Sequence, residues 1–169
     1  TFPLVNQPDT SILVWTTTPW TLPSNVLLAT GPNIKYVKIK DGDNKFIIAK
    51  ERLSAYYKNE TDYEIIEELL GTDLVGLKYI PMFDYFTNKN EDFFRVVNAN
   101  FVSTEDGTGI VHIAPAFGED DYKVGQAEKL PIVCPVDAQG CFTEEVKDWA
   151  GQYIFDADDS IIVAIKEKK

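Results

Sequence analysis

The stretch WTTTPWTLPSN, residues 15–25, joins three consecutive threonines to two prolines and two tryptophans. Threonine favours strands, but Pro19 lacks the backbone N–H that a central strand donates. We therefore expect a short buried strand over residues 12–16, which are rich in branched side chains, and an end to that strand at Pro19. Three hydroxyl groups would then gather at the end of the strand.

Composition is that of one folded domain. The chain has 169 residues, of which 44% are hydrophobic, and we expect residues 1–169 to form a single domain. Its net charge of −11 is spread along the chain, which argues against a broad phosphate-binding surface. Neither a run of ~20 apolar residues nor a signal-peptide pattern occurs, so we expect a cytoplasmic protein without membrane contact. The chain begins without Met and ends in the charged sequence KEKK, as a domain excised from a longer polypeptide would.

Metal and cofactor signals are weak. Cys134, Cys141 and the single histidine cannot supply a four-ligand zinc site, and we expect both cysteines to be unpaired small hydrophobic residues. The GTG at 107–109 lacks the further glycine of a dinucleotide-binding loop. We therefore expect neither a metal nor a cofactor.

Strand patterns dominate the rest of the chain. Residues 35–50 alternate apolar and polar side chains around a DGDN turn and predict a hairpin. Residues 63–70 fit a strand or a helix, and 71–83 a loop over the core. Further strands are expected at 26–29, 93–102 and 110–115, and helices at 51–58, 118–129 and the C-terminus. The expected fold is mixed α/β, with a closed or strongly curved β-barrel core and peripheral helices.

Two polar groups interrupt the apolar pattern in the second half of the chain. His112 lies within the apolar strand, where a hydrogen-bonded core role is the simpler interpretation, although flanking GTG and APAFG sequences offer backbone that a ligand could approach closely. Glu119, Asp120 and Asp121 fit the first turn of a helix, whose dipole favours carboxylates. Only one of the three need face a ligand.

Other interpretations stay open on the residues alone. A threonine, His112 and an acid could form a hydrolase triad, but no G-x-S-x-G turn is present. Trp15 and Trp20 could stack on a base or belong to the core. Composition and spacing alone predict no more than an α/β domain with candidate polar residues.

Three segments in the same order add a family resemblance. WTTTPWTLPSN, GTDLVGLKYIPMF (71–83) and GTGIVHIAPAFGEDDY (107–122) closely resemble the inserted (CP1) editing domain of isoleucyl-tRNA synthetases, a class I family. Leucyl and valyl relatives carry a TTRPET- or TTRPDT-like variant of the first motif, so Pro19-Trp20-Thr21 favours the isoleucyl branch. ATP-site signatures of the catalytic domain are absent, as expected for an excised insertion.

The resemblance implies hydrolytic proofreading of tRNA(Ile) that carries valine. Valyl-adenylate is a further substrate that the resemblance allows. One methylene is worth only ~1–3 kcal/mol of discrimination, a limit for which the isoleucyl enzymes are the standard example. A second site must therefore remove valine and exclude isoleucine by size. The partners implied are the 3′ CCA end of mischarged tRNA(Ile), its valine moiety and the rest of the synthetase in cis, with the isolated domain a monomer.

Roles follow residue by residue from the same resemblance. Asp121 would hold the α-ammonium of the substrate, and His112 would lie beside its aliphatic side chain. Thr17 and Thr18, supported by Asn25, would position the ester and an attacking water, helped by the neighbouring ribose hydroxyl and without a metal or an acyl-enzyme. Thr16 would line the terminal ribose and Trp15 would form a wall. The alternatives are a domain of this fold that binds aminoacyl ligands or a partner without catalysis, and the editing domain of a valyl or leucyl enzyme.

Overall fold

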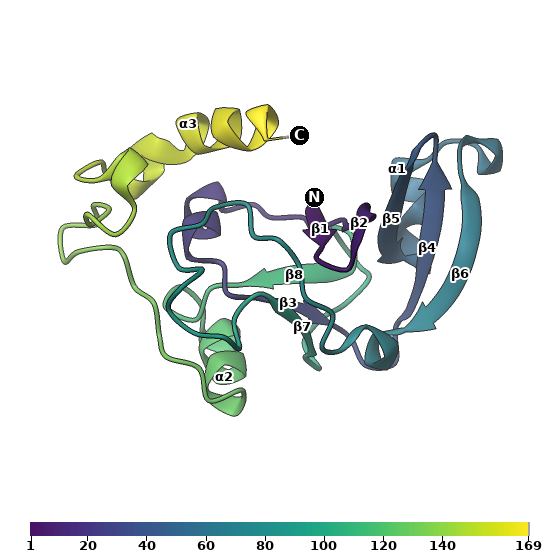
Figure 1. Cartoon of the computed structure of the whole chain (residues 1–169), viewed down its shortest axis with the longest axis horizontal. Helices are drawn as coiled ribbons and strands as arrows, with labels where there is room; N and C mark the ends of the chain where they lie inside the picture. The colour runs from purple at the N-terminus through teal and green to yellow at the C-terminus, as the bar shows by residue number, and fades with distance from the viewer. Residues whose placement is uncertain (169) are drawn as a thin grey trace. The chain divides into compact units, whose positions relative to one another are not determined.

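The computed structural model describes residues 1–168, and their contacts divide the chain into two compact units (Figure 1). Unit 1 comprises Thr1–Thr16, Leu27–Ile80 and Phe94–His112. Unit 2 comprises Thr17–Val26, Pro81–Phe93 and the chain from Ile113 to the last described residue. The expectation of a single domain stays a prediction.

Unit 1 contains a five-stranded sheet in the order β1-β2-β5-β4-β6. Its strands are β1 (Phe2–Leu4), β2 (Gln7–Ile12), β4 (Lys35–Asp41), β5 (Asn44–Ala49) and β6 (Glu64–Leu70). Figure 1 shows β4 between β5 and β6, and both of these neighbours run antiparallel to it. β2 joins β5 in parallel.

The predicted hairpin is confirmed as β4 and β5, which pair from Tyr36 opposite Ala49 to Asp41 opposite Asn44. Gly42 has φ of 59°, a left-handed conformation that glycine adopts without a steric cost. One face of the hairpin is buried and carries Val37, Ile39 and Ile48. Local alternation and turn chemistry therefore decide this element.

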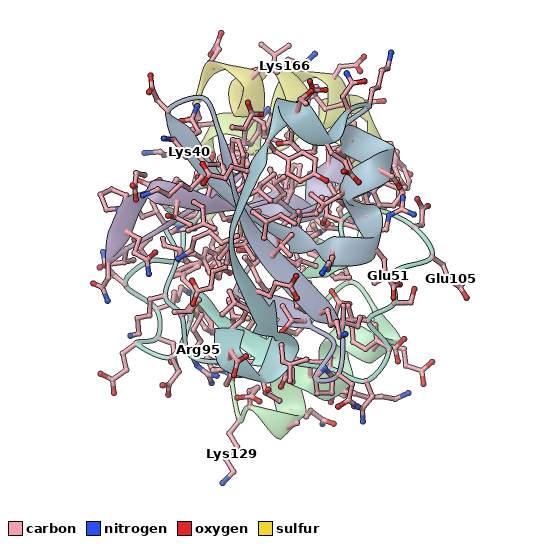
Figure 2. All side chains as sticks on the ribbon, turned by 90° about the vertical axis from the view of Figure 1, so that its right-hand side faces the viewer. Lys40, Glu51, Arg95, Glu105, Lys129 and Lys166 are labelled. Carbon is pink, nitrogen blue, oxygen red and sulfur yellow. The ribbon has the colours of Figure 1, made fainter. Side chains whose placement is uncertain are left out.

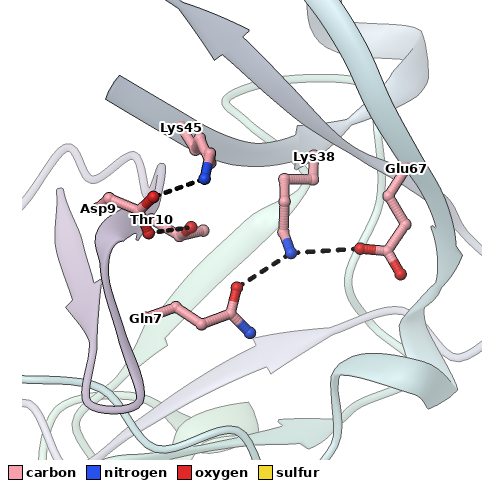
Figure 3. Close-up of polar contacts among 6 residues, drawn as sticks. All are labelled: Gln7, Asp9, Thr10, Lys38, Lys45 and Glu67. Atoms are coloured by element: carbon pink, nitrogen blue, oxygen red, sulfur yellow. Dashed lines mark hydrogen bonds and ion pairs between the residues drawn. The ribbon is translucent and has the colours of Figure 1, made fainter. Parts of the chain in front are cut away.

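Two lysines, one on β4 and one on β5, bind side chains of β2 (Figure 3). Lys38 Nζ donates to Gln7 Oε1 at 3.0 Å and pairs with Glu67 Oε2 at 3.2 Å. Lys45 Nζ pairs with Asp9 Oδ2 at 2.5 Å, and this hydrogen bond lowers the pKa of the Asp9 carboxyl. The Lys45–Asp9 pair is exposed, and exposed pairs contribute little stability.

The second sheet has three strands in the order β7-β3-β8. They are β3 (Leu27–Thr30), β7 (Arg95–Asn98) and β8 (Ile110–Ile113). β3 is central and buried at all of its positions, and it runs parallel to β7. The strands expected at 26–29, 93–102 and 110–115 are thus confirmed, the last two in shorter form.

The prediction of a closed or strongly curved barrel core is wrong. Among residues 1–168 the two sheets are open. Residues 76–80 reach β1 and β7 through a few backbone hydrogen bonds and the isolated bridges Leu4–Tyr79 and Lys78–Arg95, and they form no strand of either sheet. Closure requires a continuous ladder around the sheet. Gly76, with φ of 84°, and Pro81 interrupt the segment that would have to provide it.

The strand expected over residues 12–16 is also misplaced. β2 ends at Ile12, and Pro19 begins a 3-10 helix, η1 (Pro19–Ser24), instead of terminating a strand. Proline is well suited to the first helical position, where its missing N–H would have no partner in the helix. The threonines therefore occupy a connection between β2 and η1.

Helices and short turns complete the chain, and they are η2 (Lys50–Arg52), α1 (Leu53–Tyr56), η3 (Glu60–Asp62), η4 (Gly71–Leu74), α2 (Glu119–Ala127), η5 (Lys147–Trp149) and α3 (Ile154–Glu167). The helices expected at 51–58, 118–129 and the C-terminus are confirmed, and the ambiguous segment 63–70 is strand β6. In unit 2, Trp20 packs edge-to-face on Phe117 and Phe155, and its backbone N–H donates to Asp158 Oδ1 at 2.8 Å. Trp20 is therefore a packing residue that joins η1 to α3.

Both cysteines are free, as predicted, but Cys134 is exposed and so does not behave as a buried hydrophobic residue. Within residues 1–168, no helix has the length and apolar character needed to cross a membrane. In the same part of the chain, no cluster of three or more His, Cys, Asp or Glu side chains is arranged to hold a metal ion.

Candidate functional site

The threonine segment leads directly into η1. Thr17 and Thr18 are exposed and Thr16 is half-buried. The Thr18 carbonyl accepts the Thr21 backbone N–H at 3.1 Å and the Thr21 hydroxyl at 2.8 Å. The 3-10 helix is thus anchored through the Thr18 backbone, which leaves its first turn fixed beside the exposed hydroxyl groups.

Asn25 follows η1 and is buried. Its backbone N–H donates to the Leu22 carbonyl at 3.1 Å, and the next residue, Val26, donates to the Ile113 carbonyl at 3.0 Å. This second bond joins the residue after the 15–25 motif to the last residue of β8. Two stretches that are almost 90 residues apart in the sequence therefore lie side by side within unit 2.

Asp121 lies in the first turn of α2 and turns back toward the same segment. Its Oδ2 accepts the Ala114 backbone N–H at 2.8 Å. Burial raises the pKa of the Asp121 carboxyl, and the bond from Ala114 opposes that effect only in part. A half-buried carboxylate held in this way gains from a cationic partner.

The neighbouring carboxylates differ from Asp121. Glu119 and Asp120 are exposed, and both pair with Lys123, at 2.7 Å and 3.8 Å. They are helix-start charges on the solvent side of α2. The structure thereby separates Asp121 from its two acidic neighbours, which the sequence pattern treats alike.

His112 is buried in β8, among the residues of unit 1. Burial lowers the pKa of its imidazole from 6.5 to about 4. The side chain is therefore neutral at pH 7, and its bulk and polarity, not a positive charge, are what it offers.

We expect this burial to appear in the pH dependence of stability. The unfolded imidazole binds a proton near pH 6.5, whereas the folded one does so near pH 4. Acidification through this window therefore favours the unfolded chain, by roughly 3 kcal/mol once complete. Urea unfolding of the wild type and His112→Gln at several values between pH 7.5 and 4 measures the effect. The wild type should lose more stability than the variant, and parallel curves would contradict the assignment.

Trp15 lies against the loop that precedes β8. A Cβ atom added to Gly107 would lie 3.1 Å from Trp15 Cε3, and Gly107 has φ of 62°. Gly109, with φ of 74°, is approached in the same way by the Ala49 side chain. The close approach expected here from a ligand is therefore made by the protein's own side chains.

The predicted residues fall in both units. Trp15, Thr16 and His112 belong to unit 1. Thr17, Thr18, Asn25 and Asp121 belong to unit 2, where the bonds from Val26 and Ala114 bring the segments carrying Asn25 and Asp121 together. Sequence reasoning did not include Arg52, whose guanidinium binds the loop beneath Trp15. Because its partner is 55 residues away, no local pattern could have identified it.

Comparison with known proteins identifies homologues of the chain. No protein-family model matches it. The cytoplasmic isoleucine–tRNA ligase of Mus musculus is 52% identical over 177 aligned positions, which cover 99% of this chain and 14% of that protein. The isoleucine–tRNA ligase of Bdellovibrio bacteriovorus is 47% identical over 171 positions, covering 99% and 16%. The chain is homologous to isoleucine–tRNA ligases along almost its whole length. It spans about one sixth or less of these isoleucine–tRNA ligases.

Solved structures show the fold. The crystal structure described as GlLeuRS-CP1 matches with a TM-score of 0.69 at 14% identity, covering 94% of this chain and 81% of that one. The P. falciparum cytosolic leucyl-tRNA synthetase editing domain matches with a TM-score of 0.61 at 14% identity, covering 94% and 76%. The resemblance seen in the three sequence motifs is thus confirmed, and the mixed α/β fold matches that of CP1 editing domains.

Proposed function

We propose that this chain is the editing domain of an isoleucine–tRNA ligase and hydrolyses the ester of tRNA(Ile) mischarged with valine. The observation that carries the proposal is 52% identity to such a ligase over 99% of the chain, together with the CP1 fold. The chemical need is clear, because one missing methylene cannot be rejected well enough by binding alone. Valyl-adenylate is a second substrate that the same chemistry allows.

The proposed roles match the state of each group. Asp121, a half-buried carboxylate, holds the α-ammonium of the substrate through a charge-assisted hydrogen bond. His112, buried and neutral, lies beside the aliphatic side chain and opposes isoleucine by its bulk. Trp15 forms a wall and Thr16 lines the terminal ribose.

Ester hydrolysis requires a positioned water and a stabilised oxyanion. The hydroxyl groups of Thr17 and Thr18 can donate and accept at once, and Asn25 caps the far end of η1, the helix that follows them. Water is the proposed nucleophile, helped by the ribose hydroxyl beside the ester. The partners are the 3′ CCA end of tRNA(Ile), the valine moiety and the rest of the ligase in cis.

The direct test is deacylation of valyl-tRNA(Ile) by the intact ligase that carries this chain. Turnover well above the rate in buffer supports the proposal. Binding without turnover would favour the non-catalytic alternative. A preference for tRNA mischarged in the valyl or leucyl system would instead move the domain to one of those enzymes.

The exclusion role of His112 gives a prediction of its own. His112→Ala in the intact ligase should deacylate correctly charged isoleucyl-tRNA(Ile) about 10- to 100-fold faster than the wild type, because room for one methylene is worth ~1–3 kcal/mol. His112→Gln retains most of the bulk and serves as the control. Loss of valyl-tRNA(Ile) hydrolysis without any gain toward isoleucine would point to acid–base chemistry instead.

A further inference from the structure

One guanidinium group binds three carbonyls of the loop that precedes β8. Arg52, the last residue of η2, donates from Nε to the Gly107 carbonyl at 2.7 Å. Its Nη1 donates to the carbonyls of Glu105 at 3.3 Å and Thr104 at 3.4 Å. Hydrogen bonds from a charged donor are stronger than neutral ones, and the planar fork of arginine holds several acceptors in fixed geometry. We call residues 103–109 the STEDGTG loop.

Residues next to Arg52 hold the same loop. The Ala49 backbone N–H donates to the Thr108 carbonyl at 3.0 Å, and Glu51 Oε2 accepts the Thr104 hydroxyl at 2.6 Å. Figure 2 shows Glu51 and Glu105 reaching the surface at the same edge of the molecule. Because all of these contacts lie within unit 1, the end of β5 and η2 form a fixed support for the loop.

The STEDGTG loop packs against the side chain of Trp15. A Cβ atom built on Gly107 would lie 3.1 Å from Cε3 and 3.2 Å from Cβ of Trp15. The backbone of Gly107 therefore packs against the indole. Trp15 is nevertheless 43% exposed, so one part of the ring rests on the loop while another part is open. The orientation of this exposed ring therefore depends on where Gly107 is held.

We propose that Arg52 is a positioning residue that fixes the indole of Trp15 for aminoacyl-adenosine binding. This inference rests on the proposed function, in which Trp15 is a wall for that ligand. Arg52 does not touch the ligand; it acts through Gly107 and the ring above it. Without the guanidinium, three carbonyls lose a charged donor, and the ring and loop must be ordered when the ligand binds.

The expected functional signature is a loss of affinity. Arg52→Ala should raise the Kd of a non-hydrolysable valyl-adenosine analogue, and the KM for valyl-tRNA(Ile), about tenfold, since ordering a large side chain and its loop on binding has an effect of that size. The kcat should stay within about twofold, because the groups around the ester are untouched. Arg52→Lys keeps the charge but not the planar fork, so it should restore part of the affinity.

The structural readout is independent of activity. The chain contains three tryptophans, Trp15, Trp20 and Trp149, so labelling with 5-fluorotryptophan gives three ¹⁹F resonances, and Trp15→Phe identifies one of them. Arg52→Ala should shift or broaden the Trp15 resonance and leave those of Trp20 and Trp149, both in unit 2, in place. Lys50→Ala is the matched control: it removes the same charge from η2, but Lys50 pairs with Glu68 of β6 and not with the loop.

The outcomes separate the two proposals. An unchanged Trp15 resonance and unchanged Kd in Arg52→Ala, or equal effects in Lys50→Ala, would overturn the positioning role. If the wild type does not bind the analogue although Arg52→Ala moves the Trp15 resonance, the structural clamp stands and the proposed function fails. Should Arg52→Ala not fold, Arg52→Lys with the same two measurements decides the matter, and a wild-type spectrum and Kd would count against the proposal.

Discussion

Asp121→Asn is expected to weaken binding of a valyl-adenosine analogue by about 2–5 kcal/mol, which is roughly 30- to 4,000-fold in Kd. The substituted amide keeps an oxygen that can accept the Ala114 N–H, so only the negative charge is removed. An ammonium ion taken out of water then has no anionic partner. Calorimetric titration of the wild type and the variant measures the effect.

The change in stability caused by Asp121→Asn has a definite sign. Burial raises the pKa of Asp121, so the folded chain holds this proton more tightly than the unfolded chain does. Above that pKa the ionised carboxylate opposes folding, and Asp121→Asn should therefore be at least as stable as the wild type at pH 7. Function and stability are then separable in one substitution.

Asp120→Asn is the control for this prediction. It removes the same charge one residue earlier on α2, from an exposed side chain that pairs with Lys123. Its affinity for the analogue should match that of the wild type. Equal affinities for wild type and Asp121→Asn would refute the assigned role, and a larger loss in Asp120→Asn would show that the wrong carboxylate had been chosen.

Local pattern predicted the elements that local interactions determine. The β4–β5 hairpin was predictable because alternation, a glycine turn and a short loop all act within 16 residues. β2 was missed because QPDTSI lacks clear alternation and contains Pro8, which a central strand rarely tolerates. The parallel pairing of β2 with β5 covers Thr10–Ile12, so Pro8 lies outside it.

Closure of the sheet could not be predicted in the same way. Whether a sheet closes depends on the pairing of edge strands that are far apart in the sequence, and no single segment encodes this. The edge strand β6 carries three glutamates and is exposed along most of its length, features that discourage further pairing. The sequence therefore supported the α/β class but not the topology.

The features of the candidate residues were likewise only partly predictable from the sequence. The motifs located Thr16–Thr18, His112 and Asp121 through the family resemblance, whereas the composition alone treated Asp121 and Asp120 as equivalent. The difference between these two carboxylates arises from a bond to Ala114 and from burial, both of which are properties of the folded chain. The clamp of Arg52 on the STEDGTG loop is of the same kind.

Thr17→Val and Thr18→Val should each lower the rate of valyl-tRNA(Ile) deacylation by the intact ligase by ~10²–10³-fold, the usual effect of losing one donor in the transition state. Valine keeps the branched shape and removes only the hydroxyl. The first turn of η1 depends on the Thr18 carbonyl, which valine also has, and Thr18→Val removes only a long 3.5 Å contact between the Thr18 and Thr21 hydroxyls, so the thermal stability should change little. Thr61→Val, at an exposed position in η3, makes the same chemical change and should leave the rate at the wild-type value.

The same measurement separates a water nucleophile from a threonine nucleophile. A hydrolase triad built on His112 would pass through an ester between valine and a threonine Oγ, whereas attack by water leaves no covalent intermediate. Mass spectrometry of the wild-type ligase, quenched during deacylation, should therefore find no added valyl group on Thr16, Thr17 or Thr18. A valyl adduct on any of them would refute the water mechanism. Wild-type rates in both valine variants, at unchanged stability, would show that Thr17 and Thr18 only connect β2 to η1.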